Sequence, residues 1–387
     1  MADDRRPLKV AYVASLDLPD NRRAHAMQML KNGQAMAQCV EDFEFITDVW
    51  WHNRKRLTPE VMGAFYGITH PFPIIGMPLR RFAGSNIPWL RQLYFKAAAW
   101  RCKLRGVDFI YTRTYPLVKE SLKRGLATVV EIHSPPGRTP ELDAMLPLMQ
   151  HPKLLAFTTI SQPLADRYRE AGVPAEKLLV LPDGVDLERF AQPLTTAQAR
   201  QKLGLDPQRP MGVYVGHLYD GRGIDTMLEA ARRLPGVDFH IVGGYPKDIA
   251  RWQQEANGLP NMRFAGFVEN EQVPLHLWAG DFLMMPYGNG CATKEWMSPL
   301  KLFEYMAAQR PIISSDFPIL REVISHEQEG YFAPPDDGPA WAQAIETLMA
   351  DAALRQRMAE QGFQKVQAFS WKRRMEQVLE KVSPLLP

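Results

Sequence analysis

One segment of the sequence, MSPLKLFEYMAAQRPIISSD (297–316), combines a lysine and a glutamate with the pattern of a helix start. Ser298 is a residue type that caps helices, and Pro299 suits the first helical position. Lys301 and Glu304 would then lie on one side of the first turns. Free amides, the positive end of the helix dipole and an ammonium group favour a phosphate, and the carboxylate could accept from sugar hydroxyls. The alternative is an ordinary capped helix with a Lys–Glu surface pair.

A glycine-rich turn, VYVGHLYDGRGIDTMLEA (213–230), lies between a predicted strand and a predicted helix. Gly216 lets a ligand approach the backbone, and the Arg222 guanidinium suits two-point contact with a phosphate. The glycine spacing fits neither a dinucleotide fingerprint nor a P-loop. The segment therefore indicates either a second phosphate-binding cation or a plain turn with a solvated arginine.

Two other predicted strands end in groups that could meet a nucleobase. HIVGG (240–244) ends in a glycine pair that contains Gly243, and RFAGFV (263–268) ends near Phe267. Backbone groups and an aromatic ring at strand ends can contact a base, although a plain tight turn would use the same residues. Both strand ends are candidate base-binding positions.

A histidine follows a predicted strand in the first half of the chain. The segment EIHSPPG (131–137) places Glu131 and His133 two residues apart, on one face if the strand extends that far. Neighbours on one face point in parallel, which predicts only a loose contact between them. The pair is either a dyad at a strand end or a half-buried histidine with a structural role.

A cationic turn joins the first predicted strand to the first predicted helix. The segment LPDNRRAH (18–25) places Asn21, Arg23 and His25 at the start of that helix. Such a turn suits an anionic acceptor, and it is equally ordinary as surface charge.

The elements that must position these residues form two alternating series. Strands alternate with helices up to about residue 185, the pattern breaks between 186 and 211, and a second alternating series follows. A chain of 387 residues is long for one core, so we expect two domains with a linker in 186–211. Alternation of this kind predicts parallel sheets wrapped by helices on both faces, with ligands outside the carboxyl ends of the strands.

Composition narrows the class of protein. A net charge of +3 is too small to argue for nucleic acid, and the three cysteines have no metal or redox spacing, so a reducing cytoplasm is expected. The sequence predicts neither a signal peptide nor a membrane span. Residues 1–185 carry 25 Lys and Arg against 18 Asp and Glu, which weakly favours a phosphate-rich or membrane-surface partner.

One predicted helix could meet that membrane surface. Residues 80–105, RRFAGSNIPWLRQLYFKAAAWRCKLR, combine tryptophans with many cations, among them Arg80 and Arg81. Basic amphipathic helices of this kind can lie in an anionic bilayer interface. The alternative is a helix that packs Leu93 and Trp100 on the sheet and leaves its basic face in water. The first reading predicts weak, salt-sensitive membrane contact without insertion.

Taken in order, these motifs resemble the retaining family 4 glycosyltransferases, which have the GT-B fold. The resemblance rests on YVGHLYDGRGIDTMLEA, FHIVGG, RFAGFV, SPLKLFEYMAAQRPIISSD and LREVI, together with TTISQPLADRYREAGVPAEKLLVLPDGVDLERF (158–190) and FSW (369–371). In 158–190 the family usually has Asn-Gly-Val-Asp where this chain has Asp183-Gly184-Val185-Asp186. The resemblance covers nearly the whole chain and is strongest over 158–371.

The resemblance implies an α/β fold of two facing, doubly wound Rossmann-like domains. Residues 1–185 would bind the acceptor, joined by a C-terminal helix (371–387) that crosses back to them, and residues 186–370 would bind a nucleotide-sugar donor. Implied diphosphate-binding groups are Arg222, Lys301 and the amides from Ser298 to Leu300. Implied contacts of the nucleoside and the sugar are Glu304 with the ribose, Phe267 and Val268 with the base, and His133 with the donor sugar.

Two positions depart from the family pattern. The first of the family's paired glutamates should lie eight residues before Glu304, where this chain has Trp296. A diphosphate-binding arginine of the family would fall near His217, in a loop that is one residue shorter. The first departure weakens any assignment of what contacts the donor sugar.

The resemblance implies a cytoplasmic enzyme that transfers a sugar from a UDP or GDP donor to a glycan or lipid-linked acceptor, as in polysaccharide biosynthesis. Neither a metal nor a cofactor is implied, because cations and amides take the role of a metal and the nucleotide sugar is a substrate. Two alternatives stay open: a nucleotide-sugar 2-epimerase, and a non-catalytic sugar-nucleotide-binding protein. The sequence names neither the donor base, the sugar, the acceptor nor the oligomeric state.

Overall fold

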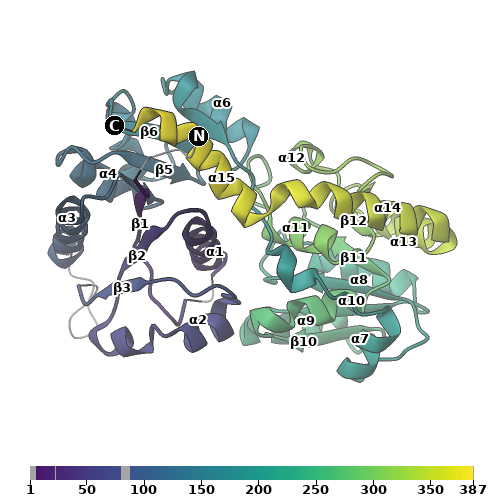
Figure 1. The fold of residues 1–387 in the computed structure, drawn as a ribbon. Coiled ribbons are helices and arrows are strands. Elements are labelled where there is room, and N and C mark those ends of the chain that lie inside the picture. Colours follow the sequence, from purple (N-terminus) through teal and green to yellow (C-terminus); the bar gives the residue numbers. More distant parts are fainter. Residues whose placement is uncertain (1–5, 22, 80–87, 387) are drawn as a thin grey trace, which may run out of the picture. The chain divides into compact units, whose positions relative to one another are not determined.

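The computed structural model describes residues 6–21, 23–79 and 88–386 of the chain (Figure 1). The chain divides into two compact units, one of residues 1–183 with 371–387 and the other of residues 184–370. We expected this division two residues later, after residue 185. Arg80 and Arg81 lie outside the described residues. Among the described helices, none is long and apolar enough to cross a membrane.

The first unit is built on a parallel sheet with the strand order β3-β2-β1-β4-β5-β6-β7. Its strands are β1 (Lys9–Ala14), β2 (Asp42–Asp48), β3 (Ile74–Met77), β4 (Phe109–Thr112), β5 (Thr128–Ile132), β6 (Leu154–Thr159) and β7 (Leu178–Val180). Its helices include α1 (Ala24–Cys39), α2 (Pro59–Tyr66), α3 (Pro88–Arg105), α4 (Tyr115–Leu122), α5 (Pro140–Asp143), α6 (Gln162–Glu170) and α15 (Trp371–Val382).

Alternating side chains of this sheet face two different layers of helices. Ala11 and Val13 of β1 pack in an apolar core with α3 and α4. Tyr12, between them, points to the other face, where its ring lies 5.1 Å from that of Tyr111 on β4. Helix α15, yellow in Figure 1, packs beside α1 in the same unit, and Arg374 of α15 reaches Tyr111. The period of two along each strand thus separates an apolar face from a face with buried polar groups.

The second unit repeats this order in a parallel sheet with the strands β10-β9-β8-β11-β12-β13. The strands are β8 (Met211–Val215), β9 (Asp238–Val242), β10 (Met262–Gly266), β11 (Phe282–Met285), β12 (Ile312–Ser315) and β13 (Tyr331–Ala333). The helices include α7 (Thr196–Leu203), α8 (Ile224–Arg233), α9 (Pro246–Ala256), α10 (Val273–Trp278), α11 (Leu300–Ala307), α12 (Pro318–Arg321), α13 (Gly338–Ala350) and α14 (Ala352–Val366).

Two apolar cores sandwich the second sheet. Val213 of β8 packs with residues of α7, α10 and α11, whereas Tyr214 packs with α8, α9 and α13. The predicted fold class, two doubly wound Rossmann-like domains, is confirmed. In both sheets the strand order reverses beside the first strand of the unit, between β1 and β4 and between β8 and β11. Open parallel sheets bind ligands at this point, outside the carboxyl ends of the strands.

The segment that we expected to be a linker, 186–211, belongs to the second unit. Phe190 is buried in its core, and its ring lies edge-on to that of Trp278 at 6.2 Å. Helix α7 follows, with a reciprocal capping box formed by Thr195 and Gln198. The pattern breaks here because short helical turns replace a strand, while the segment still buries apolar side chains.

Candidate functional site

Two loops at the reversal point of the second sheet fit into each other. They follow β8 and β11, and the first carries Arg222. A Cβ atom on Gly223 would lie 1.5 Å from the carbonyl oxygen of Pro286, and one on Gly221 would lie 2.6 Å from the amide nitrogen of Cys291. Both glycines also have positive φ, at 74° and 75°. Larger residues would force the loops apart, so the glycines fix the turn that presents Arg222.

The structure brings Arg222 and Lys301 to the same aromatic ring. Lys301 Nζ lies 3.9 Å from the ring centre of Tyr214 and 5.3 Å from that of Tyr287, and Arg222 Cζ lies 5.1 Å from the Tyr287 ring. A Cβ on Gly216 would lie 2.7 Å from Lys301 Nζ, so only glycine leaves room for the ammonium there. Arg222 and Lys301, which are 79 residues apart in the sequence, are therefore neighbours in the fold.

This pair of cations is electrostatically unfavourable by itself. Burial lowers the pKa of Lys301 well below its usual range, and the nearby Arg222 charge lowers it further. Attraction to aromatic faces offsets only part of this cost. A multiply charged anion beside both groups would relieve their repulsion, so the arrangement suits a diphosphate.

Helix α11, which carries Lys301, begins one residue later than predicted. Pro299 is the N-cap, with an extended ψ of 119°, and its carbonyl oxygen accepts from the Leu302 amide at 2.9 Å. The prediction that Ser298 caps the helix and that Pro299 is its first residue is therefore wrong. The amides of Trp296 and Met297 both donate to the carbonyl of Thr293, which closes a turn, and the chain then runs extended to reach α11.

Glu304 contacts a cation from a distant segment of the second unit. Its Oε1 atom lies 3.4 Å from Nη1 of Arg189, which comes from the short helical turn Leu187–Phe190. Tyr305, the next residue, binds α11 to the end of β8, because its hydroxyl accepts from the Val215 amide at 2.8 Å. The helix face with Lys301 and Glu304 is thereby held against the strand ends.

The other predicted donor contacts lie at the same edge of the second sheet. The Gly216 amide donates to the Val242 carbonyl at 2.9 Å, and the Gly243 amide donates to the Gly266 carbonyl at 2.7 Å. Phe267 follows β10 with 47% of its surface exposed, and Val268 packs against the core. The predicted amide contacts Ser298 and Leu300, just before and at the start of α11, are partly exposed.

Two tyrosines beside the predicted donor-binding residue His217 were missed by sequence reasoning. The His217 ring stacks on Tyr219 at 4.8 Å and on Tyr245 at 5.4 Å. An aromatic residue directly after the glycine pair that follows β9 was the available signal for Tyr245. Trp296 is buried, so the residue at the position of the missing glutamate points into the protein. Tyr214, Tyr287 and Arg189 were also missed, and their contacts depend on tertiary packing.

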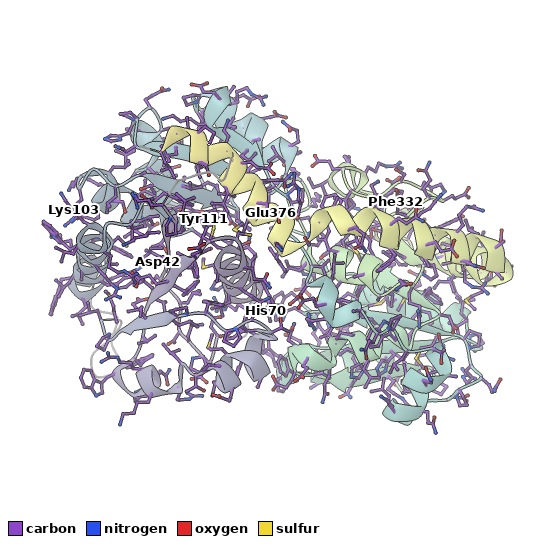
Figure 2. The ribbon with its side chains drawn as sticks, in the orientation of Figure 1. Asp42, His70, Lys103, Tyr111, Phe332 and Glu376 are labelled. Atoms are coloured by element: carbon purple, nitrogen blue, oxygen red, sulfur yellow. The ribbon has the colours of Figure 1, made fainter. Side chains whose placement is uncertain are left out.

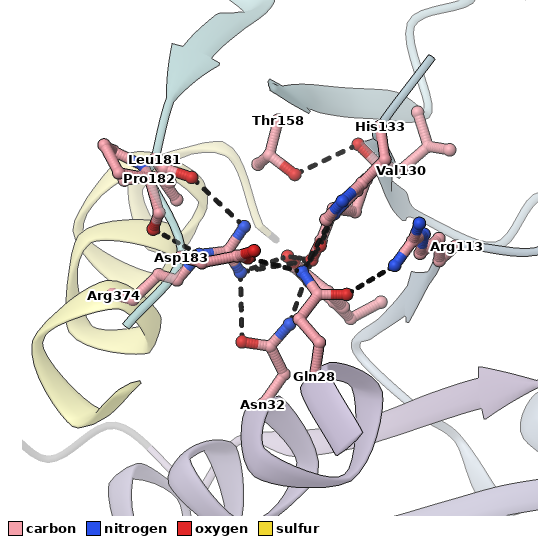
Figure 3. A network of polar contacts seen from close by, with 12 residues as sticks. Gln28, Asn32, Arg113, Val130, His133, Thr158, Leu181, Pro182, Asp183 and Arg374 are labelled. Carbon is pink, nitrogen blue, oxygen red and sulfur yellow. Dashed lines mark hydrogen bonds and ion pairs between the residues drawn. The ribbon is translucent and has the colours of Figure 1, made fainter. Parts of the chain in front are cut away.

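A network of buried polar groups lies on the face of the first sheet that is covered by α1 and α15 (Figure 3). Arg374 donates to Glu131 Oε2 at 3.1 Å and to the carbonyl oxygens of Leu181 and Pro182. Glu131 also accepts from Tyr111 and from Asn32, which lies on α1. Burial would raise the pKa of the Glu131 carboxyl, but Arg374 and His133 hold it well below its usual range. The network joins α1, β4, β5 and α15 through one ionised carboxylate.

The contact between His133 and Glu131 is direct, contrary to the loose contact predicted. His133 follows the end of β5, and its Nε2 lies against Glu131 Oε1. Strand β5 ends at Ile132, so the His133 side chain need not point parallel to that of Glu131 and can turn toward it. Burial and the Arg113 charge lower the pKa of His133 to about 3, so the imidazole is neutral. The amide nitrogen of Gln28 also lies 2.8 Å from His133 Nε2.

Asp183 is a second buried carboxyl in this network. Gln28 Nε2 donates to Asp183 Oδ1 at 2.9 Å, and Arg113 donates to Gln28 Oε1 at 2.6 Å, which fixes the orientation of the amide. Burial raises the pKa of Asp183 to about 7, although Arg374 partly offsets this. At this position the family usually has asparagine, and a protonated aspartic acid resembles an asparagine in shape and hydrogen bonding.

Because its pKa is raised, Asp183 should make the stability of the protein depend on pH. The folded state keeps a proton on Asp183 up to about pH 7, whereas the unfolded chain releases it near pH 4, so the contribution of Asp183 to stability falls as pH rises between these values. The Asp183→Asn side chain cannot ionise. We therefore expect the stability of this variant, relative to that of the wild type, to be higher at pH 8 than at pH 5. Urea unfolding at both values measures this.

The matched control for that prediction is Asp166→Asn, because Asp166 is exposed and pairs with Arg169 on the surface. We expect this control to leave the pH dependence of stability as in the wild type. An equal stability change for Asp183→Asn at both pH values would show that Asp183 does not bind a proton on folding.

The predicted acceptor residues gather at the start of α1. Asn21 Nδ2 lies 3.3 Å from His25 Nε2, and the Arg23 amide donates to Asn21 Oδ1 at 3.1 Å. Arg23 is the N-cap of α1 and is exposed, and Gln28, one turn after His25, reaches the Glu131 network. Within the described residues, no group of three or more His, Cys, Asp or Glu side chains is arranged to hold a metal ion.

Comparison with known proteins matches a glycosyltransferase family model to each half of the chain. A model described as "Glycosyltransferase Family 4" matches residues 48–189, and one described as "Glycosyl transferases group 1" matches residues 209–351. The chain is 29% identical to an alpha-D-kanosaminyltransferase of Streptomyces kanamyceticus over 61% of its length. It is 27% identical, over 50% of its length, to a GDP-mannose-dependent alpha-(1-6)-phosphatidylinositol monomannoside mannosyltransferase of Mycobacterium tuberculosis. The matched regions span 64% and 52% of these two relatives.

Solved structures share the fold across nearly the whole chain. Anabaena Alr3699/HepE in complex with UDP has a TM-score of 0.74 at 17% identity, and the match covers 97% of this chain and all of that one. Sucrose-phosphate synthase of Thermosynechococcus elongatus has a TM-score of 0.73 at 20% identity, with 97% and 99% covered. At these identities the likeness concerns the fold.

Proposed function

Because this chain belongs to the family 4 glycosyltransferases, we propose that it transfers a sugar from a UDP or GDP donor to a glycan or lipid-linked acceptor, with retention of configuration. The observation that carries the proposal is the pairing of Arg222 and Lys301 over Tyr287, at the reversal point of the second sheet. In this proposal residues 186–370 bind the donor, and residues 1–185 with 371–387 bind the acceptor.

The proposed chemistry requires stabilisation of a leaving group. When the anomeric C–O bond breaks, the bonding electron pair stays on the diphosphate as added negative charge. Lys301 and Arg222 stabilise that charge as it develops. The acceptor oxygen bonds to the anomeric carbon on the face that the diphosphate leaves, and its proton passes to a departing phosphate oxygen. We propose that the reaction is metal-independent, because the two cations fill the role of a metal.

In the first unit, His133 is proposed as a neutral hydrogen-bonding group for the sugar and not as an obligatory base. Its Nε2 is held by Glu131 and its pKa lies near 3, so it is a poor proton acceptor at neutral pH. The proposed acceptor site also includes Asn21, Arg23 and His25. We propose that the enzyme is cytoplasmic.

Donor consumption tests this function. UDP- and GDP-sugars are incubated with and without a panel of saccharide and lipid-linked acceptors, and the products are examined by proton NMR. We expect release of nucleoside diphosphate that depends on the acceptor, with the anomeric configuration of the donor kept. Conversion of the donor without an acceptor would indicate a 2-epimerase. Tight binding without any turnover would indicate a non-catalytic binding protein.

We also propose weak contact of α3 with an anionic membrane. Four apolar residues lie along one side of the helix and are exposed: Trp89 (64%), Leu93 (44%), Trp100 (50%) and Leu104 (82%). The sheet is instead covered by Tyr94, Phe95, Ala98 and Cys102, so the expectation that Leu93 and Trp100 pack on it is wrong. Figure 2 shows Lys103 on the outer side of α3, and its Nζ lies 5.6 Å from the Trp100 ring.

A flotation experiment with anionic liposomes tests this contact. We expect the protein to float at low salt and to sediment at high salt, and Trp100→Ala with Lys103→Glu to weaken flotation. Arg101 is unsuitable for such a variant, because it pairs with the buried Glu44. The control is Lys119→Glu on α4. A protein that stays at the bottom at low salt would show that α3 has no membrane role.

A further inference from the structure

Arg189 joins two segments that the proposed function places around a nucleoside. Its Nη1 lies 3.4 Å from Glu304 Oε1 on α11, and its Nη2 donates to the carbonyl oxygen of Asn270. Asn270 lies three residues after Phe267, in the loop that follows β10. One guanidinium thus links the candidate ribose acceptor to the candidate base loop.

The backbone that carries Arg189 is fixed by the core of the second unit. Phe190, the next residue, is buried against Trp278, and the Arg189 guanidinium lies 5.8 Å from the Phe190 ring. The Arg189 side chain itself is only 9% exposed. A guanidinium anchored in this way has few alternative positions, so it can hold both partners in one geometry.

We propose that Arg189 is a positioning residue that orients Glu304 toward the ribose hydroxyls of a bound nucleotide. This inference rests on the proposed function. A carboxylate has about four acceptor positions on two oxygens, so the single contact with Arg189 Nη1 does not by itself exhaust the acceptor capacity of Glu304. Among the described contacts of Arg189, none joins it to Lys301 or Arg222, so its removal should act mainly on the nucleoside half of the ligand.

The test compares three ligands on Arg189→Gln by calorimetry. The ligands are UDP or GDP, the 2′,3′-dideoxy form of the same nucleoside diphosphate, and inorganic pyrophosphate. We expect the variant to bind the ribose-containing nucleotide about 10-fold more weakly, the scale of one lost charge-assisted contact. Binding of the dideoxy nucleotide and of pyrophosphate should change less than twofold. Arg189→Lys, which retains a cation, should recover part of the loss.

Two further variants separate positioning from folding. Arg233→Gln removes an exposed cation that pairs with Glu229 on α8, and it should leave all three affinities unchanged. Glu304→Gln should reproduce the selective loss, and the double variant with Arg189→Gln should lose no more than either single change. If Arg189→Gln does not fold, Arg189→Lys carries the same comparison.

An equal loss for all three ligands would overturn the inference, because it would show a general structural effect, and so would unchanged binding of the ribose-containing nucleotide. Absence of the proposed nucleotide site would look different, since the wild type itself would then bind neither UDP nor GDP. Absence of transfer alone would show in the donor-consumption assay and would leave these affinities as expected.

Discussion

Replacing Lys301 with alanine is expected to lower kcat for sugar transfer about 100-fold, the scale that one lost group of this kind has in other enzymes. The reason is the position of its ammonium, which lies over Tyr214 and shares Tyr287 with Arg222. The charge of the departing diphosphate grows in the transition state, so loss of the ammonium should reduce kcat more than it raises KM. Steady-state kinetics of nucleoside diphosphate release measures both.

Two variants control this prediction. Arg222→Ala should behave like Lys301→Ala, and the double variant should lose less than the two single losses combined, because both cations act on one diphosphate. Lys247→Ala on α9 removes an exposed lysine and should keep the wild-type rate. Near wild-type turnover of Lys301→Ala would refute the phosphate role.

Arg374→Met is expected to destabilise the first unit by about 3–5 kcal/mol, the usual cost of removing one partner of a buried ion pair. Arg374 is 3% exposed, and its guanidinium contacts Glu131, Asn32 and Tyr111. Methionine fills similar space but leaves the Glu131 carboxylate buried without its cation. Urea unfolding followed by circular dichroism measures the loss.

The neighbouring Arg373 offers a matched control, because it lies on the exposed side of α15 and pairs with Glu376 and Glu380. Arg373→Met should change stability little, because exposed ion pairs contribute little. Adding Glu131→Gln to Arg374→Met should recover part of the lost stability. Equal losses for Arg373→Met and Arg374→Met would show that the buried network does not hold α15 to its unit.

Much of the fold follows from local patterns in the sequence. The alternation of strands and helices predicted both parallel sheets, and Gly221 and Gly223 marked the turn that presents Arg222. Helix α2 and the edge strand β3 were not predicted. Strand β3 has only four residues, Ile74–Met77, and prolines bound it on both sides, so its signal in the sequence is short. Edge strands pair on one side only, so their sequences are less constrained.

The candidate site was predicted less completely, because its geometry depends on distant contacts. Lys301 could be proposed from its place in α11, but the two tyrosines beneath it come from β8 and from the loop after β11. Arg189 lies in the segment that was predicted to be a linker, and its contact with Glu304 spans 115 residues of sequence. The start of α11 was misplaced by one residue, because propensity alone does not show the turn closed by Thr293.

The central claim, that the second unit binds a nucleotide through its diphosphate, is tested most directly by calorimetry with UDP, GDP and the matching monophosphates. The claim predicts that the wild type binds UDP or GDP, and that removal of the β-phosphate weakens binding at least about 10-fold, since Lys301 and Arg222 then lose a shared charged partner. Equal affinity for the diphosphate and the monophosphate, or no binding of any of the four nucleotides, would contradict it.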